Sequence, residues 1–136
     1  MDVEALNNIL DCLLGPDQGG AFPANLSMEL WAGDPRLAGS NEIDYPGYAA
    51  QSISTTTSWT TPASDGTKRR DTPVLFPAPT GEADDVATHW AFRNTATDAL
   101  YFVGELGADA LDITGAGPEV QIVPRVRAAD ALALIA

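Results

Sequence analysis

Cysteine and histidine are almost absent from this chain of 136 residues, which holds one of each. A single cysteine, Cys12, cannot form an intrachain disulfide, so a secreted disulfide-stabilised scaffold is excluded. One histidine, His89, and one cysteine are too few to build a zinc site. We therefore expect no metal and no cofactor. His89 is expected to be structural within a strand, and Cys12 to pack at the edge of a helix.

Basic residues are also scarce, since 7 Lys and Arg stand against 19 Asp and Glu, for a net charge of −12. Nucleic acids and anionic membranes both bind basic protein surfaces, so we expect neither as a partner. Three of the seven basic residues are consecutive: Lys68, Arg69 and Arg70. They predict a solvated loop or a local salt-bridge site rather than a groove for a polyanion.

Long hydrophobic runs are missing as well. No apolar segment approaches the roughly 20 residues that a membrane-spanning helix requires. The first four residues, Met1 to Glu4, are acidic, whereas a signal peptide begins with a basic segment. The sequence therefore predicts a protein that is made in a cytoplasm and stays soluble.

Catalytic motifs are not found either. The chain has no glycine-rich phosphate loop, no Gly-x-Ser-x-Gly elbow and no His-Glu-x-x-His. We therefore expect no enzyme, and a small hydrolase or lyase is the least favoured alternative. The acidic pairs lack the dense ligand spacing of a calcium loop and are expected to be solvated: Asp34 with Asp44, Asp84 with Asp85, and Asp109 with Asp112.

One helix is predicted, over residues 2–14, with Gly15 and Pro16 ending it. Its apolar residues recur at helical spacing and form a single stripe, which must be buried. The stripe can pack on the chain's own β domain or on a neighbouring subunit, and the sequence leaves both open. Within one domain, residues 1–18 form this helix and a flexible joint, and residues 19–136 form the β part.

The rest of the chain predicts short strands. Alternating apolar and polar residues indicate strands over 26–31, 48–54, 74–76, 86–92, 100–106 and 120–126, with an exposed strand over 55–61. Residues 86–106 form a hairpin, and polar or turn-rich residues predict loops over 36–47, 62–71 and 109–117. The fold class is mainly β: a compact β-sandwich or jelly-roll-like barrel of about seven short antiparallel strands with one N-terminal helix.

Four segments, in this order, resemble small virion proteins of tailed bacteriophages. They are Phe22–Pro35, Pro46–Gln51, Val74–Pro79, and the hairpin segments Val86–Phe92 and Leu100–Leu106. The resemblance covers roughly residues 20–125. The family includes capsid decoration, head-fibre and tail-fibre-like proteins. The resemblance implies a compact β-sandwich that assembles as a homotrimer, with no catalytic residues.

Within this family, the sequence favours a capsid decoration (cement) protein that binds the outer shell and stabilises capsid subunits. The chain stops soon after its last predicted strand, with no fibre-like extension. An acidic protein also suits the capsid exterior, because packaged DNA repels it from the lumen. The expected partners are the major capsid protein and further copies of the chain, after synthesis in the cytoplasm of the host bacterium. The alternative is a tail, collar or fibre component that binds a host-surface glycan.

The expected contact surface combines the helix with the loops near the tryptophans and the basic run. The apolar tail, residues 128–136, is either a helix or a strand, and it is the domain's last element or part of an intersubunit contact. In the fibre alternative, Trp59 and the Ser/Thr-rich segment 52–61 contact sugars. The predicted interface residues are Leu6, Leu10, Leu13, Trp31, Trp59, Lys68, Arg69, Arg70 and Leu134.

Overall fold

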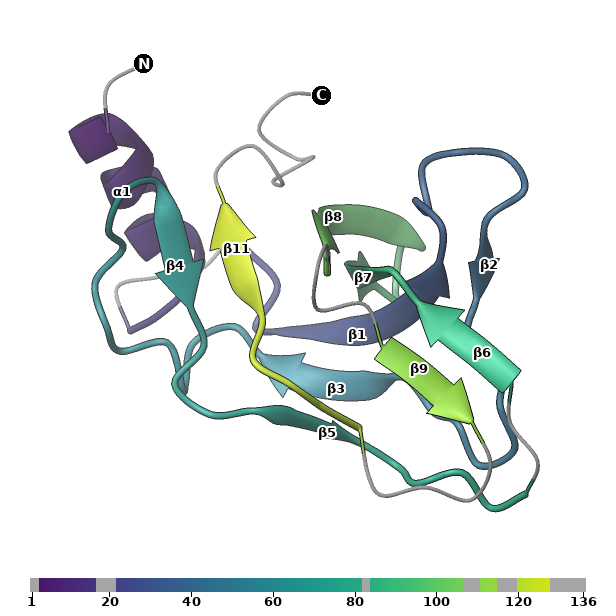
Figure 1. The fold of residues 1–136 in the computed structure, drawn as a ribbon. Helices are drawn as coiled ribbons and strands as arrows, with labels where there is room; N and C mark the ends of the chain where they lie inside the picture. Colours follow the sequence, from purple (N-terminus) through teal and green to yellow (C-terminus); the bar gives the residue numbers. More distant parts are fainter. Residues whose placement is uncertain (1–2, 17–21, 82–83, 107–110, 115–119, 128–136) are drawn as a thin grey trace.

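The computed structural model describes residues 3–16, 22–81, 84–106, 111–114 and 120–127. They form one helix, α1 (Val3–Leu13), and eleven strands, all paired antiparallel (Figure 1). The predicted mainly β class and the N-terminal helix are confirmed, although the described residues hold more strands than the seven expected. The joint at Asp17–Gly20 and the tail that contains Leu134 lie outside the described residues.

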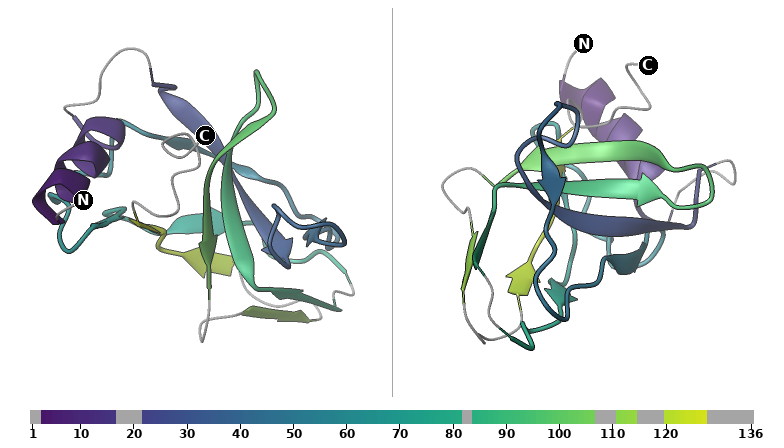
Figure 2. Two further views of the ribbon diagram at one scale, coloured as in Figure 1. Left: turned by 90° about the horizontal axis from the view of Figure 1, so that it is seen from above. Right: turned by 90° about the vertical axis from the view of Figure 1, so that its right-hand side faces the viewer.

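Five strands form the main antiparallel sheet, in the order β2–β1–β7–β8, with β3 also paired to β1. The central strand, β1, pairs with β7 along one edge and with β2 and β3 along the other. Figure 2 shows the β7–β8 hairpin extending beyond the rest of this sheet. The five strands are β1 (Asn25–Ala32), β2 (Asn41–Glu42), β3 (Gln51–Ser54), β7 (His89–Asn94) and β8 (Ala99–Glu105).

The other six strands pair two by two, and we call these pairs the ladders. They are β4 (Thr67–Arg69) with β11 (Arg125–Arg127), β5 (Val74–Phe76) with β10 (Val120–Ile122), and β6 (Asp84–Ala87) with β9 (Leu111–Thr114). The strands β9, β10 and β11 therefore pair with β6, β5 and β4 in reverse order (Figure 1). Most of the strands that the sequence did not predict belong to these ladders.

One hydrophobic core joins the main sheet to the ladders and to α1. In β1, Leu26, Met28 and Leu30 face this core, as their alternation with polar residues predicts. Phe92 of β7 lies at its centre, in ring contact with Trp59, Trp90 and Phe102. The ladders add buried residues to the same cluster: Val74, Phe76, Ala87, Ile113, Ile122 and Val126.

A tight contact between Trp90 and Gly104 fixes the packing of the β7–β8 hairpin. The two residues are direct partners across the hairpin. A Cβ atom on Gly104 would lie 2.3 Å from the Trp90 ring, so only glycine leaves room for the indole. Beyond this contact, the register shifts between Phe92 and Arg93, where β8 accommodates a bulge.

The predicted exposed strand at 55–61 is wrong. The Ser54 hydroxyl accepts hydrogen bonds from the backbone N–H groups of Thr56 and Thr57, at 3.2 and 3.1 Å. This local turn competes with strand pairing and outweighs the β propensity of the threonines. The chain then brings Trp59 into the core, where its side chain is fully buried and its indole N–H donates to the Ser54 carbonyl at 2.9 Å.

The predicted loop at 62–71 contains strand β4. Asp65 and Gly66 have positive φ angles of 53° and 71°, and they form a two-residue hairpin turn. Ser64 and Thr67, on either side, exchange both backbone hydrogen bonds at 2.9 Å. The polar composition concealed this strand, because its buried residue is Lys68 rather than an apolar one.

Further boundaries differ from the prediction, and the loop expected over 36–47 contains β2. The strand expected over 86–92 divides at Thr88, where the chain leaves the β6–β9 ladder and joins the main sheet. The loop expected over 109–117 contains β9, and the strand expected over 120–126 is divided into β10 and β11. Strands of three or four residues offer few alternations for periodicity to detect, and the sequence predicted only β5 among them with its observed bounds.

Candidate functional site

The helix α1 packs against its own domain, beside β4 at one end of the molecule (Figures 1 and 2). Leu10 and Leu14 are fully buried in the core. The Asp11 carboxylate lies 2.6 Å from the Lys68 ammonium and accepts a hydrogen bond from the Ala63 backbone at 2.9 Å. Of the two arrangements that the sequence left open, the structure therefore shows packing within one chain.

A second polar contact ties the helix to the hairpin turn before β4. The Asn7 side-chain oxygen accepts a hydrogen bond from the Gly66 backbone N–H at 2.8 Å. Leu6 lies next to the same glycine, within ordinary van der Waals distance of the position of a Cβ atom. The turn and β4 are therefore held in place by α1 as well as by the β11 ladder.

Beside this turn lies an open groove with a volume of about 350 Å³, which we call the arginine groove. Its two basic residues are Arg69 of β4 and Arg125 of β11, which are direct partners in the ladder. Their neighbours Lys68 and Val126 point into the core, so both arginines face outward. The remaining lining residues are Thr61, Pro62, Ser64, Asp65 and Thr67.

A second groove, of about 360 Å³, is acidic. It is lined by Glu42, Ile43, Asp44 and Tyr48. The Tyr48 hydroxyl donates to the Glu42 carboxylate at 2.8 Å and accepts from the Leu30 N–H at 3.1 Å. Burial raises the pKa of Glu42 and of Tyr48 above their ordinary values. Because Glu42 and Tyr48 are hydrogen-bonded to each other and Tyr48 is hydrogen-bonded to Leu30, this groove is a structural junction between the β2 segment and β1.

A buried charge pair crosses the main sheet. The Arg93 guanidinium donates to the Glu29 carboxylate at 2.9 Å, and this contact raises the pKa of Arg93. The other Glu29 oxygen accepts from the Trp31 indole N–H at 3.0 Å. Arg93 also donates to the Asp98 carbonyl at 2.9 Å, which ties the β7–β8 turn to the sheet. Trp31, a predicted interface residue, is therefore held in a fixed orientation and is half-buried.

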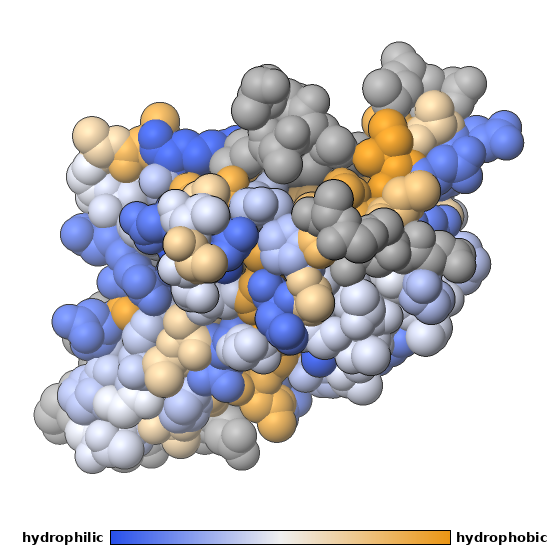
Figure 3. Space-filling view, turned by 180° about the vertical axis from the view of Figure 1, so that it is seen from behind, coloured by the Kyte–Doolittle hydropathy of each residue, from blue (hydrophilic) through white to orange (hydrophobic). Residues whose placement is uncertain are grey.

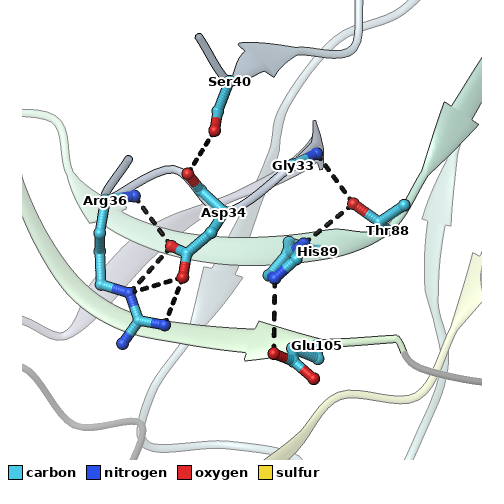
Figure 4. Close-up of polar contacts among 7 residues, drawn as sticks. All are labelled: Gly33, Asp34, Arg36, Ser40, Thr88, His89 and Glu105. Atoms are coloured by element: carbon cyan, nitrogen blue, oxygen red, sulfur yellow. Dashed lines mark hydrogen bonds and ion pairs between the residues drawn. The ribbon is translucent and has the colours of Figure 1, made fainter. Parts of the chain in front are cut away.

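The single histidine lies in a small polar cluster at the end of β1 (Figure 4). His89 Nδ1 lies 2.9 Å from the Thr88 hydroxyl, which accepts a hydrogen bond from the Gly33 N–H at 2.8 Å. His89 Nε2 lies 3.8 Å from the exposed Glu105 carboxylate. The Ser40 hydroxyl donates to the Asp34 carbonyl and is therefore not poised to act as a nucleophile. These contacts link the turn after β1 to β7, and the structural role expected for His89 stays a prediction.

The comparison with known families decides the kind of protein. A family model described as podophage GP4 fiber I protein gp80 matches residues 4–110. The chain belongs to this family. The resemblance to tailed-phage virion proteins is thereby confirmed. No curated protein matches the chain.

The family match runs from α1 to just beyond β8. It therefore includes the helix, the whole main sheet and one strand of every ladder, β4, β5 and β6. The partner strands β9, β10 and β11 lie beyond it. The matched region thus includes both α1 and the Asp65-Gly66 turn that α1 contacts.

The structure places the predicted interface residues in three different environments. Leu10, Trp59 and Lys68 are buried, with Lys68 only 3% exposed, so in this fold they hold α1 and the core in place. Leu6, Leu13, Trp31 and Arg70 are half-buried, and Arg69 is exposed. Leu134 lies outside the described residues. The structure does not gather this set into one surface, and their role in contacts with a partner stays a prediction.

Two features of the arginine groove escaped the sequence analysis. Arg125 lies far from the basic run in the chain, and only the β4–β11 pairing brings it opposite Arg69. The turn had a local signal, because Asp65-Gly66 is a typical pair for a two-residue hairpin.

Cys12, expected to pack at the helix edge, is exposed instead.

The described ranges offer no metal site, since no three His, Cys, Asp or Glu side chains are grouped to hold an ion. Of the acidic pairs that the sequence singled out, Asp109 lies outside those ranges. As for membranes, α1 is the one helix described, and it is too short to cross a bilayer.

Proposed function

We propose that this chain is a fibre component of a podophage virion, acting as a compact attachment module at the tail. The observation that supports this most strongly is the match to the fibre family over residues 4–110, which includes the helix and the main sheet. A fibre component is the alternative that the sequence analysis kept open. The family description favours it over the capsid decoration role, for which no comparison speaks.

The surface formed by the described residues supports a module that presents polar grooves rather than a broad apolar interface. Large exposed apolar residues lie on separate elements: Val3, Leu37, Leu75, Val86 and Val123. From behind, hydrophilic and hydrophobic residues are interspersed, with orange groups gathered on the side of α1 (Figure 3). Stable obligate assemblies usually bury larger continuous apolar patches. Assembly as a homotrimer is part of the proposal and would use smaller or more polar contacts.

Trp59 has no part in the proposed attachment. Its ring is fully buried and packs against Phe92, so it offers no face on which a sugar could stack. A catalytic role is not proposed either. Within the described residues, His89 contacts a threonine hydroxyl and an exposed carboxylate, and the Ser40 hydroxyl that shares its cluster donates to a backbone carbonyl. The proposed role is structural and binding.

The location of the chain in the virion tests this proposal. Purified particles of the parent phage would be labelled with an antibody against the chain, and its copy number measured against the major capsid protein by quantitative mass spectrometry. We expect a small number of copies per particle and label at the tail. A copy number comparable to that of the shell protein, with label over the head, would overturn the fibre proposal in favour of decoration. Absence from particles would overturn both.

A further inference from the structure

Two arginines face each other in the arginine groove without a counterion. Arg69 and Arg125 are direct cross-strand partners, which places their Cβ atoms about 5 Å apart on the same face of the ladder. Like charges in this position are destabilising. No carboxylate lies within ion-pair distance of either arginine in the part of the chain that the structure describes.

Three other cations of the described residues are ion-paired, whereas Arg70 donates its hydrogen bonds to Thr72 and to the Pro73 carbonyl. Lys68 is paired with Asp11, Arg36 with Asp34, and Arg93 with Glu29 and Asp98. The chain has 19 acidic residues and 7 basic ones, so a counterion for two further arginines would be easy to supply. The groove nevertheless keeps both guanidinium groups exposed, which leaves their forked N–H donors available to an external oxyanion.

Hydrogen bonds within the turn and contacts with α1 hold the β4 side of the groove in place. The Asp65-Gly66 turn is closed by both Ser64–Thr67 hydrogen bonds, and the Gly66 N–H is bonded to Asn7 of α1. One residue away, Lys68 is anchored to Asp11. A site whose walls are already ordered loses less entropy when a ligand binds.

The other walls match a ligand with hydroxyl groups. Thr61, Ser64 and Thr67 contribute hydroxyls, and Asp65 contributes a carboxylate that can accept hydrogen bonds from a polyhydroxylated ligand. The volume of about 350 Å³ falls near the small end of the range of about 300–1,000 Å³ that is typical of small-molecule sites. A bare phosphate would leave most of it unfilled, and an acidic carboxylate beside the arginines disfavours a long polyanion.

We propose that the arginine groove binds an oxyanion carried on a sugar ring, the carboxylate or phosphate of an acidic saccharide. Arg69 and Arg125 would hold the oxyanion, while the hydroxyls and Asp65 bind the hydroxyl groups of the ring. This inference rests on the proposed attachment function for its biological setting, since it names the chemistry of the surface to which the module attaches.

Binding to defined probes tests the site directly. The purified full chain would be titrated by calorimetry and by amide NMR with trimannuronate, its methyl ester, mannose 6-phosphate, inorganic phosphate and a triglutamate peptide. The ester keeps the ring and removes the charge. Three variants accompany the wild type: Arg69→Gln, Arg125→Gln and, as the matched control, Arg36→Gln, which alters an exposed arginine outside the groove.

We expect trimannuronate, mannose 6-phosphate or both to bind the wild type, and preference for one of them identifies the oxyanion. The Arg69→Gln and Arg125→Gln variants should each lose affinity by at least about tenfold, as loss of a charge-assisted contact implies, while Arg36→Gln keeps it. Amide shifts should be centred on Ser64 and Thr67. Binding should weaken as salt concentration rises, and the two groove variants should unfold no more easily than the wild type.

Several results would overturn the inference. Equal affinity in all four proteins, or no binding of any acidic sugar, would show that the groove is not the site. If inorganic phosphate binds as tightly as the sugars, the sugar ring is not recognised. If triglutamate binds more tightly than the sugars, the groove is a peptide site instead. These outcomes are independent of the virion labelling. Saccharide binding by a chain that labels the head would support the binding site and refute the fibre role. Label at the tail without saccharide binding would support the fibre role and refute the binding site.

Discussion

The three longest strands of the main sheet differ from the ladder strands in length, and therefore in the number of hydrogen bonds that each pairing gains. β1, β7 and β8 have 8, 6 and 7 residues, and a short turn joins β7 to β8. Ladder strands have only three or four residues, and their partners are far apart in the chain, as with Arg69 and Arg125. Each ladder therefore closes a long loop while gaining few hydrogen bonds.

This difference assigns separate roles to the two regions. The main sheet holds the aromatic centre of the core and is expected to contribute most of the free energy of unfolding. The ladders depend on that core for their packing and are expected to open at lower free energy. The arginine groove is built on a ladder, and α1 supplies the additional contacts that keep this ladder ordered.

The largest effect should follow from Phe92→Ala. Phe92 is fully buried and contacts three other aromatic rings. Removing it should lower the free energy of unfolding by about 3–5 kcal/mol, because a large core cavity remains. Urea denaturation measures this loss, with Leu75→Ala as the control, since that side chain is 46% exposed. A loss no greater than in the control would refute the central role of the main sheet.

Asp11→Ala tests how α1 supports the ladder region. The change leaves the Lys68 ammonium buried without its carboxylate and removes the acceptor of the Ala63 N–H. We expect a loss of about 1–3 kcal/mol in the free energy of unfolding, measured by urea denaturation.

The double variant Asp11→Ala/Lys68→Met provides the matched comparison. It replaces both charges by apolar groups and should recover most of the lost stability. Asp98→Asn is a control at an ion-paired carboxylate that is 89% exposed, and it should cost little because asparagine also tolerates the positive φ of 61° at this position. If Asp11→Ala costs no more than Asp98→Asn, the buried pair does not stabilise the domain.

A smaller and more local effect is expected for Val126→Ala in β11. Val126 is fully buried beneath the arginine groove, and its truncation should cost about 1–2 kcal/mol. Native-state hydrogen exchange should show faster exchange in the β4–β11 ladder and little change in β7 and β8. Val123→Ala, at a side chain that is 41% exposed, is the matched control. Equal acceleration in β7 and β8 would mean that sheet and ladders open together.

The smallest effect concerns pH and the turn after β1. Hydrogen bonds from Arg36 lower the pKa of Asp34 from 3.8 to about 2. Because this native pKa lies below that of the unfolded chain, the pairing stabilises the turn above pH 3.8 and is lost as pH falls towards 2. Exposure of Arg36 keeps the contribution small. Arg36→Gln should move the NMR titration midpoint of Asp34 up towards 3.8, and an unchanged midpoint would contradict this cause.

The amino-acid sequence alone determined the helix, the core-facing residues of β1 and the β7–β8 hairpin, because each carries several repeats of its hydrophobic period. The number of glycine and proline residues favoured many turns and short strands, and the mainly β class is confirmed. The family resemblance followed from the same segments, whereas the preference for decoration over a fibre did not receive support from the family match.

Only the tertiary structure decided the ladders and the groove. The apolar strand β5 was predicted, but the polar strand β4 carries no recognisable pattern, since the burial of Lys68 depends on a carboxylate from a distant helix. Likewise, Arg69 and Arg125 become neighbours only when the chain returns antiparallel to β4. Local periodicity specifies which residues face inward along one element, but pairing between distant elements depends on the packing of the whole core, and the arginine groove depends on that pairing.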